Sequence, residues 1–81
     1  MDNRYKAIIL RMSKVQLSED QLKDDMKLVD DLSLDSISFV NMIVNLEATY
    51  GFSFDDEYIS YDMLKTVKDV ADYVSRKTGQ G

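Results

Sequence analysis

Residues 37–50 are the most apolar stretch of the chain, and they constrain its fold more than any other part. Apolar residues recur in it at intervals of three and four, the spacing of one face of an α-helix. They are Phe39, Met42, Ile43, Leu46 and Tyr50. Gly51 is expected to end this helix, because glycine adopts left-handed backbone angles without steric cost. Asp35 or Ser36 is expected to cap its start, where a side-chain oxygen accepts hydrogen bonds from free N–H groups.

The same helix carries a second apolar face. At about 100° per residue, this face consists of Ile37, Val40, Val44 and Ala48. A small domain cannot easily bury so wide an apolar arc, so part of it should line an interior pocket or meet a partner. The alternative is that a short third helix and a long loop simply cover it.

Two further helices and their connections are predicted from the rest of the chain. An amphipathic helix should cover residues 3–15, and the last helix should begin after Thr66, a favourable capping residue. Residues 16–35 are expected to form a long ordered loop with no more than one helical turn at residues 18–21. A brief helical piece should end near Ile59.

The predicted fold class is therefore all-α: a small bundle of three main helices plus one short helix, with a long first loop. Residues 1–81 are expected to form one domain, with 76–81 as a frayed tail. The chain contains no cysteine, so helix packing must stabilise it without disulfides.

Composition excludes several classes of function. The chain has no His, Cys or Trp, which leaves few groups that titrate near neutral pH or act as nucleophiles, so an enzyme with catalytic residues is not expected. A net charge of −5 disfavours nucleic acids as partners. Neither a membrane span nor a signal peptide is apparent, which predicts a cytoplasmic protein, expected to be monomeric. No metal is expected, because the loop at residues 30–35 fails the calcium-loop pattern.

The distribution of charge is uneven. No basic residue lies between Lys27 and Lys65, which predicts an acidic surface that attracts proteins with basic surfaces. The acids of this segment are Asp30, Asp31, Asp35, Glu47, Asp55, Asp56, Glu57 and Asp62. A solvated acidic loop without a partner is the alternative reading.

A motif at the start of the apolar helix resembles one found in a known family. The pattern Asp-Leu-x-x-Asp-Ser-Ile begins at Asp31 and includes Ser36, and further matches follow over nearly the full length. These are Val40, Leu46-Glu47, Thr66-Val67 and Asp72-Tyr73-Val74. Taken together, they make the chain similar to the acyl carrier proteins, a family of phosphopantetheine-dependent carriers.

This resemblance implies a carrier whose chemistry is done by other proteins. Ser36 is the position that would receive 4′-phosphopantetheine from coenzyme A, with Asp35 beside it in the motif, and the arm's thiol would hold an acyl group as a thioester. The implied partners are a phosphopantetheinyl transferase and enzymes that load or transfer acyl groups. The residues expected to contact them are Asp31, Asp35, Ile37, Val40, Val44 and Glu47. The residues expected to line an acyl pocket are Val40, Ile43, Leu46, Phe54, Ile59 and Leu64.

The chain departs from the family pattern in two places. Ser33 stands where the family usually has Gly, so the turn there is expected to differ in backbone angles. The apolar helix is also less acidic than that of a fatty-acid carrier, which leaves fatty-acid, polyketide and nonribosomal-peptide pathways all open. An unmodified acidic adaptor that binds partners through the same helix is the alternative function.

Overall fold

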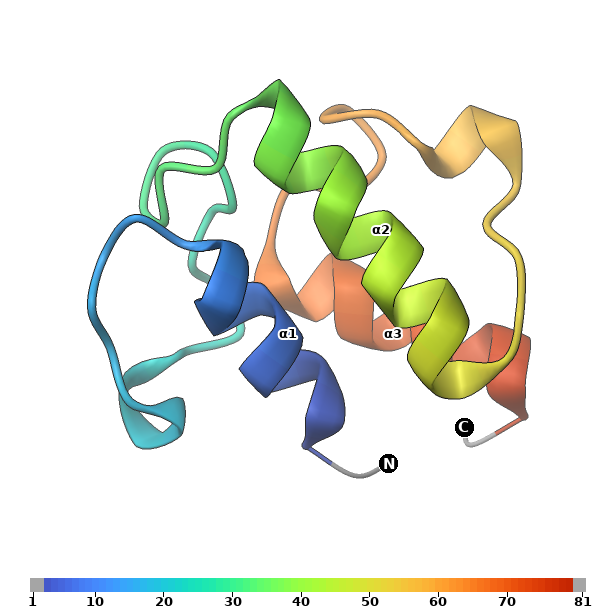
Figure 1. The fold of residues 1–81 in the computed structure, drawn as a ribbon, viewed down its shortest axis with the longest axis horizontal. Helices are drawn as coiled ribbons and strands as arrows, with labels where there is room; N and C mark the ends of the chain where they lie inside the picture. The colour runs from blue at the N-terminus through green and yellow to red at the C-terminus, as the bar shows by residue number, and fades with distance from the viewer. Residues whose placement is uncertain (1–2, 80–81) are drawn as a thin grey trace.

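The computed structural model describes residues 3–79, and it confirms the all-α prediction (Figure 1). None of the helices in that range is both long and apolar enough to cross a membrane. Three α-helices are joined by a long first loop and a shorter second link, each of which contains one turn of 3-10 helix. The elements are α1 (Arg4–Met12), η1 (Glu19–Gln21), α2 (Ser36–Tyr50), η2 (Asp56–Tyr58) and α3 (Val67–Thr78).

The core forms where the apolar faces of the three helices meet. In Figure 1, α1 and α2 lie side by side, and α3 crosses behind α2. Ile9 from α1, Leu46 from α2 and Val70 from α3 are all completely buried. This confirms that Leu46 belongs to the core, together with Phe39, Met42 and Ile43 from the predicted face of α2. The main driving force is burial of this apolar surface.

The first loop is ordered because it has its own apolar residues. Leu22, Leu28, Leu32 and Leu34 are buried against the helices. The loop is also tied to the start of α3, where Val67 N–H donates to the carbonyl oxygen of Met26 at 3.0 Å. The N–H groups of a first helical turn have no partner within the helix, so the loop supplies an acceptor that α3 lacks.

Both termini of α2 follow the predicted signals. Asp35 is the N-cap residue, and Gly51 ends the helix with a φ of 70° in the left-handed region. Thr66 caps α3 as predicted: its side chain accepts from the N–H of Asp69, whose carboxylate in turn accepts from Thr66 N–H.

Two predicted helix ends are wrong. The first helix ends at Met12 and not at residue 15, because Ser13 is extended and its hydroxyl donates to the Leu32 carbonyl oxygen at 3.1 Å. Residues 76–78, expected in a frayed tail, continue α3, where the Thr78 hydroxyl donates to the Val74 carbonyl at 2.7 Å. Gln80 and Gly81 of that predicted tail lie outside the described residues.

The predicted fourth helix is only the single turn η2. Asp55 occupies its N-cap position, but its carboxylate makes no capping hydrogen bond. It instead accepts from the Tyr73 hydroxyl at 3.1 Å and pairs with Lys77 at 3.3 Å. These contacts attach the second link to α3 while leaving the turn without the cap that a longer helix would use.

Ser33 keeps the backbone conformation that glycine would adopt more easily. Its φ is 59°, and it is the only residue other than glycine with a positive φ in the range 3–79. The turn therefore keeps left-handed angles in spite of the substitution, contrary to the expectation that they would differ. Its conformation is held by the bond from Ser33 N–H to the Val29 carbonyl oxygen at 3.1 Å and by the buried neighbours Leu32 and Leu34.

We expect Ser33→Gly to raise the free energy of unfolding by about 0.5–1 kcal/mol. Glycine removes the steric cost of left-handed backbone angles, which is roughly 1–2 kcal/mol for other residues. This gain exceeds the stability that is lost because glycine makes the unfolded chain more flexible. Urea denaturation measures the difference. Ser53→Gly, at another exposed serine in a loop without a positive φ, is the matched control and should lower stability. A lower urea midpoint for Ser33→Gly would contradict the assignment of strain to this residue.

Candidate functional site

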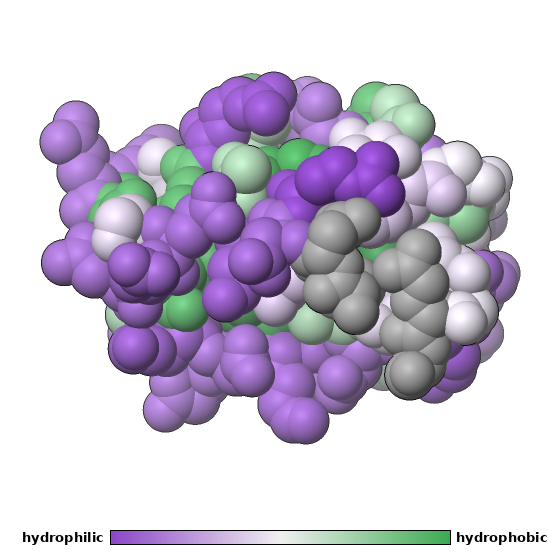
Figure 2. Space-filling model, turned by 90° about the horizontal axis from the view of Figure 1, so that it is seen from below, coloured by the Kyte–Doolittle hydropathy of each residue, from purple (hydrophilic) through white to green (hydrophobic). Residues whose placement is uncertain are grey.

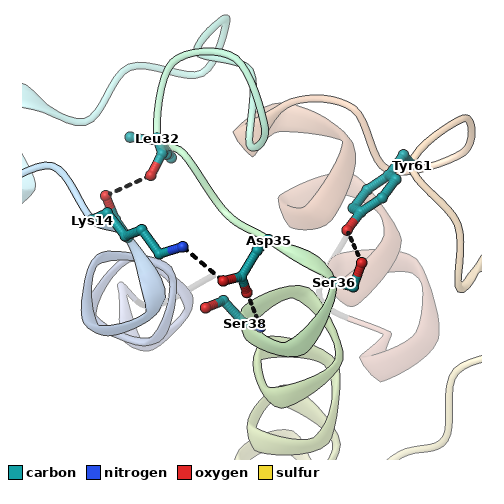
Figure 3. A network of polar contacts seen from close by, with 7 residues as sticks. Lys14, Leu32, Asp35, Ser36, Ser38 and Tyr61 are labelled. Atoms are coloured by element: carbon teal, nitrogen blue, oxygen red, sulfur yellow. Dashed lines mark hydrogen bonds and ion pairs between the residues drawn. The ribbon is translucent and has the colours of Figure 1, made fainter.

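The candidate site is built around the first turn of α2, whose first residue is the exposed Ser36 (Figure 3). The preceding residue, Asp35, fixes this turn: its Oδ1 accepts from the N–H of Ser38 at 2.8 Å. The Asp35 carbonyl oxygen also accepts from Phe39 N–H at 2.8 Å, as the first helical bond. Of the two predicted capping residues, Asp35 is therefore the cap, and the hydroxyl of Ser36 is not needed for that role.

Lys14, which sequence analysis did not select, holds Asp35 from the other side. Its Nζ lies 2.6 Å from Asp35 Oδ2, and its backbone N–H donates to the Leu32 carbonyl oxygen at 3.2 Å. The loop that follows α1 is thus bound to the segment that leads into α2. The hydrogen bond from Lys14, together with that from Ser38 N–H, holds the pKa of Asp35 well below its usual range. No sequence signal links Lys14 to a carboxylate 21 residues away.

The predicted acidic surface is partly neutralised. Lys14, from the loop that follows α1, pairs with Asp35, and Lys77, from α3, pairs with Asp55. Asp31 remains exposed, although one of its oxygens accepts from Lys27 N–H at 2.8 Å. Lys14 and Lys77 are both distant from the acidic segment in sequence, but the fold brings them next to it.

The other side of Ser36 faces the link between η2 and α3. The Tyr61 hydroxyl donates to Ser36 Oγ over 3.4 Å, a long and weak hydrogen bond (Figure 3). The Tyr61 ring also packs edge-on against Phe39, with ring centroids 4.7 Å apart. A cavity of about 410 Å³ opens between these elements, and we call it the Ser36 cavity. Its walls are Ser36, Phe39, Val40, Ile59, Ser60, Tyr61 and Asp62.

The six predicted pocket residues do not come together in one cavity. Val40 and Ile59 line the Ser36 cavity, and Leu64 lines a neighbouring one. Ile43, Leu46 and Phe54 are packed in the core and are not among the residues that line either cavity. Ile43 and Leu46 lie on the buried face of α2, further along the helix from Ser36 than Phe39, and their side chains are packed in the core. Sequence reasoning missed the aromatic residue of the second link, Tyr61.

The second apolar face of α2 is exposed next to this site. Ile37, Val40 and Val44 are 74%, 50% and 54% accessible, and we call these three residues the exposed stripe. The second link and the first loop therefore do not cover these three residues, and the alternative that this face of α2 is simply covered is wrong. Figure 2 shows the molecule from below, the side opposite to the start of α2 in Figure 1. That face is mostly hydrophilic. Contiguous exposed apolar residues of this kind are typical of a contact surface.

Glu47, the predicted partner contact at the far end of α2, has a structural role. It is half-buried, and its Oε2 accepts from the N–H of Phe54 at 2.7 Å. Because its carboxylate fixes the chain that leaves α2, Glu47 is a less suitable partner contact than the exposed stripe.

The residues at the start of α2 fit a phosphate ester on the Ser36 hydroxyl. A helix N-terminus directs N–H groups and the positive end of the helix dipole toward such a group. Asp35 would repel a phosphate, but Lys14 compensates the charge of its carboxylate. The exposed hydroxyl of Ser36 leaves room for a bulky substituent.

Comparisons with known proteins agree with this geometry. The chain matches the family described as "Phosphopantetheine attachment site" over residues 6–74. It is 31% identical to an acyl carrier protein of Thermotoga maritima over 77 residues, which cover 95% of this chain and 90% of the relative. It is also 38% identical over 60 residues to an acyl carrier protein of Coprothermobacter proteolyticus, covering 74% and 71% of the two chains.

Solved structures give the same result. A structure from Mycobacterium tuberculosis that has been assigned as an acyl carrier protein superposes with a TM-score of 0.76 at 26% identity. The superposition covers 89% of this chain and 90% of that one.

The ion pair at the site predicts a specific pH dependence. The pKa of Asp35 is lowered on folding, so its contribution to stability is complete above about pH 4, the unfolded value, and is lost as pH falls toward the lower folded value. We expect Asp35→Asn to lower the urea midpoint at pH 7, and the difference from the wild type to shrink steadily below about pH 4.

The matched control is Asp30→Asn, which removes one charge from the same acidic segment but not the partner of Lys14. It should change the midpoint less than Asp35→Asn at neutral pH. A difference between wild type and Asp35→Asn that stayed constant across the acid range would show that the ion pair does not stabilise the fold.

Proposed function

The chain belongs to the acyl carrier protein family, and from this premise we propose that Ser36 is the residue that receives the 4′-phosphopantetheine group. Members of this family are carriers and not enzymes. When bound, the group supplies the thiol that this cysteine-free chain lacks, so that an acyl cargo is held as a thioester. The partners that follow from family membership are a phosphopantetheinyl transferase and biosynthetic enzymes.

One observation carries the assignment to Ser36. Its hydroxyl is exposed at the first residue of α2, directly after the capping Asp35. The cap and the Lys14 ion pair hold this turn in place without using the Ser36 side chain. Ser36 is thus presented on a rigid element and remains available for modification.

The exposed stripe supports a proposal about how partners are recognised. Glu47 is the only acidic residue within α2, and its carboxylate is engaged with Phe54 N–H. Acids near Ser36, such as Asp31, would speed the approach of a basic partner, and the stripe would hold that partner after docking. Recognition of this kind is compatible with fatty-acid, polyketide and nonribosomal-peptide biosynthesis, so the pathway stays open.

An unmodified adaptor is the second candidate function, and the exposed stripe is the observation that favours it. Such an adaptor would bind partner proteins through the same residues of α2. It gives no reason, however, for the motif around Ser36 or for the match to the phosphopantetheine attachment family. The carrier explains both the motif and the stripe.

Modification of Ser36 tests the proposal directly. Incubation with coenzyme A, Mg²⁺ and a broad-specificity phosphopantetheinyl transferase should add one phosphopantetheine to the wild type, measured by intact mass. Ser36→Ala should gain no mass. Ser38→Ala, a serine of the same helical turn, is the matched control and should be modified. An unmodified wild type, or a modified Ser36→Ala variant, would refute the carrier assignment.

Val44→Asp tests recognition by apolar contact. It places a charge in the exposed stripe, and an unpaired carboxylate is costly to bury against a partner. We expect kcat/KM for phosphopantetheine transfer to fall about tenfold, the loss expected for an interface anchor worth more than 1 kcal/mol. Thermal stability should change little, because Val44 is 54% exposed.

Asn41→Asp is the control, since it adds the same charge at an exposed polar position of α2. It should leave transfer nearly unchanged. If both variants lose activity equally, charge and not apolar contact controls recognition, and the stripe is not the anchor.

A further inference from the structure

Two cavities lie on the two sides of Tyr61. The first is the Ser36 cavity, of about 410 Å³. The second, of about 270 Å³, lies against the first loop and the start of α3, and we call it the Leu64 cavity. It is lined by Lys27, Val29, Asp30, Tyr61, Leu64 and Lys65. Tyr61 is the one residue that these two linings share, so its side chain is the wall between them.

Contacts of both its hydroxyl and its ring hold the Tyr61 side chain in this position. Its hydroxyl donates to Ser36 Oγ over 3.4 Å, and its ring packs edge-on against Phe39. An edge-on pair of rings adds only modestly to the stabilisation from its burial, and a 3.4 Å hydrogen bond adds little. Tyr61 is also 39% exposed, on a segment between η2 and α3 that has no regular secondary structure. Tyr61 therefore has a defined position between the cavities, but its contacts are weak enough for the side chain to move.

The position of Ser36 determines which cavity is reached first. Ser36 lines its own cavity and does not line the Leu64 cavity. A group attached to Ser36 that folds back onto the protein meets Phe39, Val40 and Ile59 first, and Tyr61 blocks its further path. Beyond Tyr61, the buried side chain of Leu64 offers more apolar surface.

We infer that Tyr61 is a specificity-determining gate that limits the length of the linear acyl cargo this carrier can shield from solvent. The inference rests on the proposed function, because the cargo must be attached through Ser36. In the closed position, a short chain fills the Ser36 cavity and longer chains leave their distal methylenes in water. Removing the Tyr61 ring joins the two cavities, so that a longer chain is buried and the burial of each methylene favours the shielded state.

The test compares a series of cargoes on wild type and variants. A transferase that accepts acyl coenzyme A thioesters is used to attach butyryl, octanoyl, dodecanoyl or hexadecanoyl pantetheine, and intact mass confirms each product. Two properties are then measured for each: the shift in thermal midpoint relative to the unmodified protein, and the rate at which hydroxylamine cleaves the thioester. Both report burial of the cargo and require no partner enzyme.

In the wild type, protection of the thioester from hydroxylamine should rise from butyryl to dodecanoyl and then stop rising. In Tyr61→Ala, it should continue to rise, so that the hexadecanoyl thioester is cleaved at least about fivefold more slowly than in the wild type. Tyr61→Phe keeps the ring and should retain the wild-type limit. Met63→Ala, an exposed residue of the same segment that lines neither cavity, controls for general loosening and should also retain it.

Identical protection profiles in wild type and Tyr61→Ala would overturn the gate, as would a Met63→Ala profile that matches Tyr61→Ala. If Tyr61→Ala does not fold, as judged by circular dichroism, Tyr61→Val replaces it and the same comparison decides. If intact mass shows that no pantetheine adduct forms on the wild type, the proposed function fails at that step, and the gate fails with it.

Discussion

The Asp35 carboxylate is the contact on which the arrangement of the site depends. One of its oxygens caps α2 through Ser38 N–H, and the other pairs with Lys14 in the loop that follows α1. A single side chain therefore caps α2 and ties its start to the loop that follows α1. The pair is exposed, and exposed ion pairs contribute little to stability. Its importance lies in geometry, because it fixes the turn that presents Ser36 without involving Ser36 itself.

Sequence reasoning succeeded where the signals are local. The helix period of residues 37–50, a cap at Asp35 or Ser36 and the stop at Gly51 are signals of one element. The structure confirms the period and the stop, and it shows that Asp35 is the cap. The capping residue of α3, Thr66, was predicted for the same reason. The division of α2 into two apolar faces also followed from the sequence, since it depends only on the angle between successive residues. That the second face is exposed is known only from the structure.

Sequence reasoning failed where contacts join distant parts of the chain. Lys14 meets Asp35 across 21 residues, and Tyr61 meets Ser36 across 25. Neither pair has a periodic signal, because loop paths bring them together and loop paths are set by the packing of the whole domain. The predicted pocket residues are dispersed for a related reason: Ile43 and Leu46 are apolar residues of α2, but only the assembled core determines which apolar residues are left beside a cavity.

Phe39 connects the two roles of α2. It is buried in the core, and it also forms a wall of the Ser36 cavity and the surface on which Tyr61 rests. Packing in a protein core is dense, so a change on one side of a buried ring is felt on the other. A group that fills the Ser36 cavity contacts both Phe39 and Tyr61, which line it. The stability of the helical core is therefore physically linked to what occupies the space beside Ser36, although the hydroxyl of Ser36 takes no part in that core.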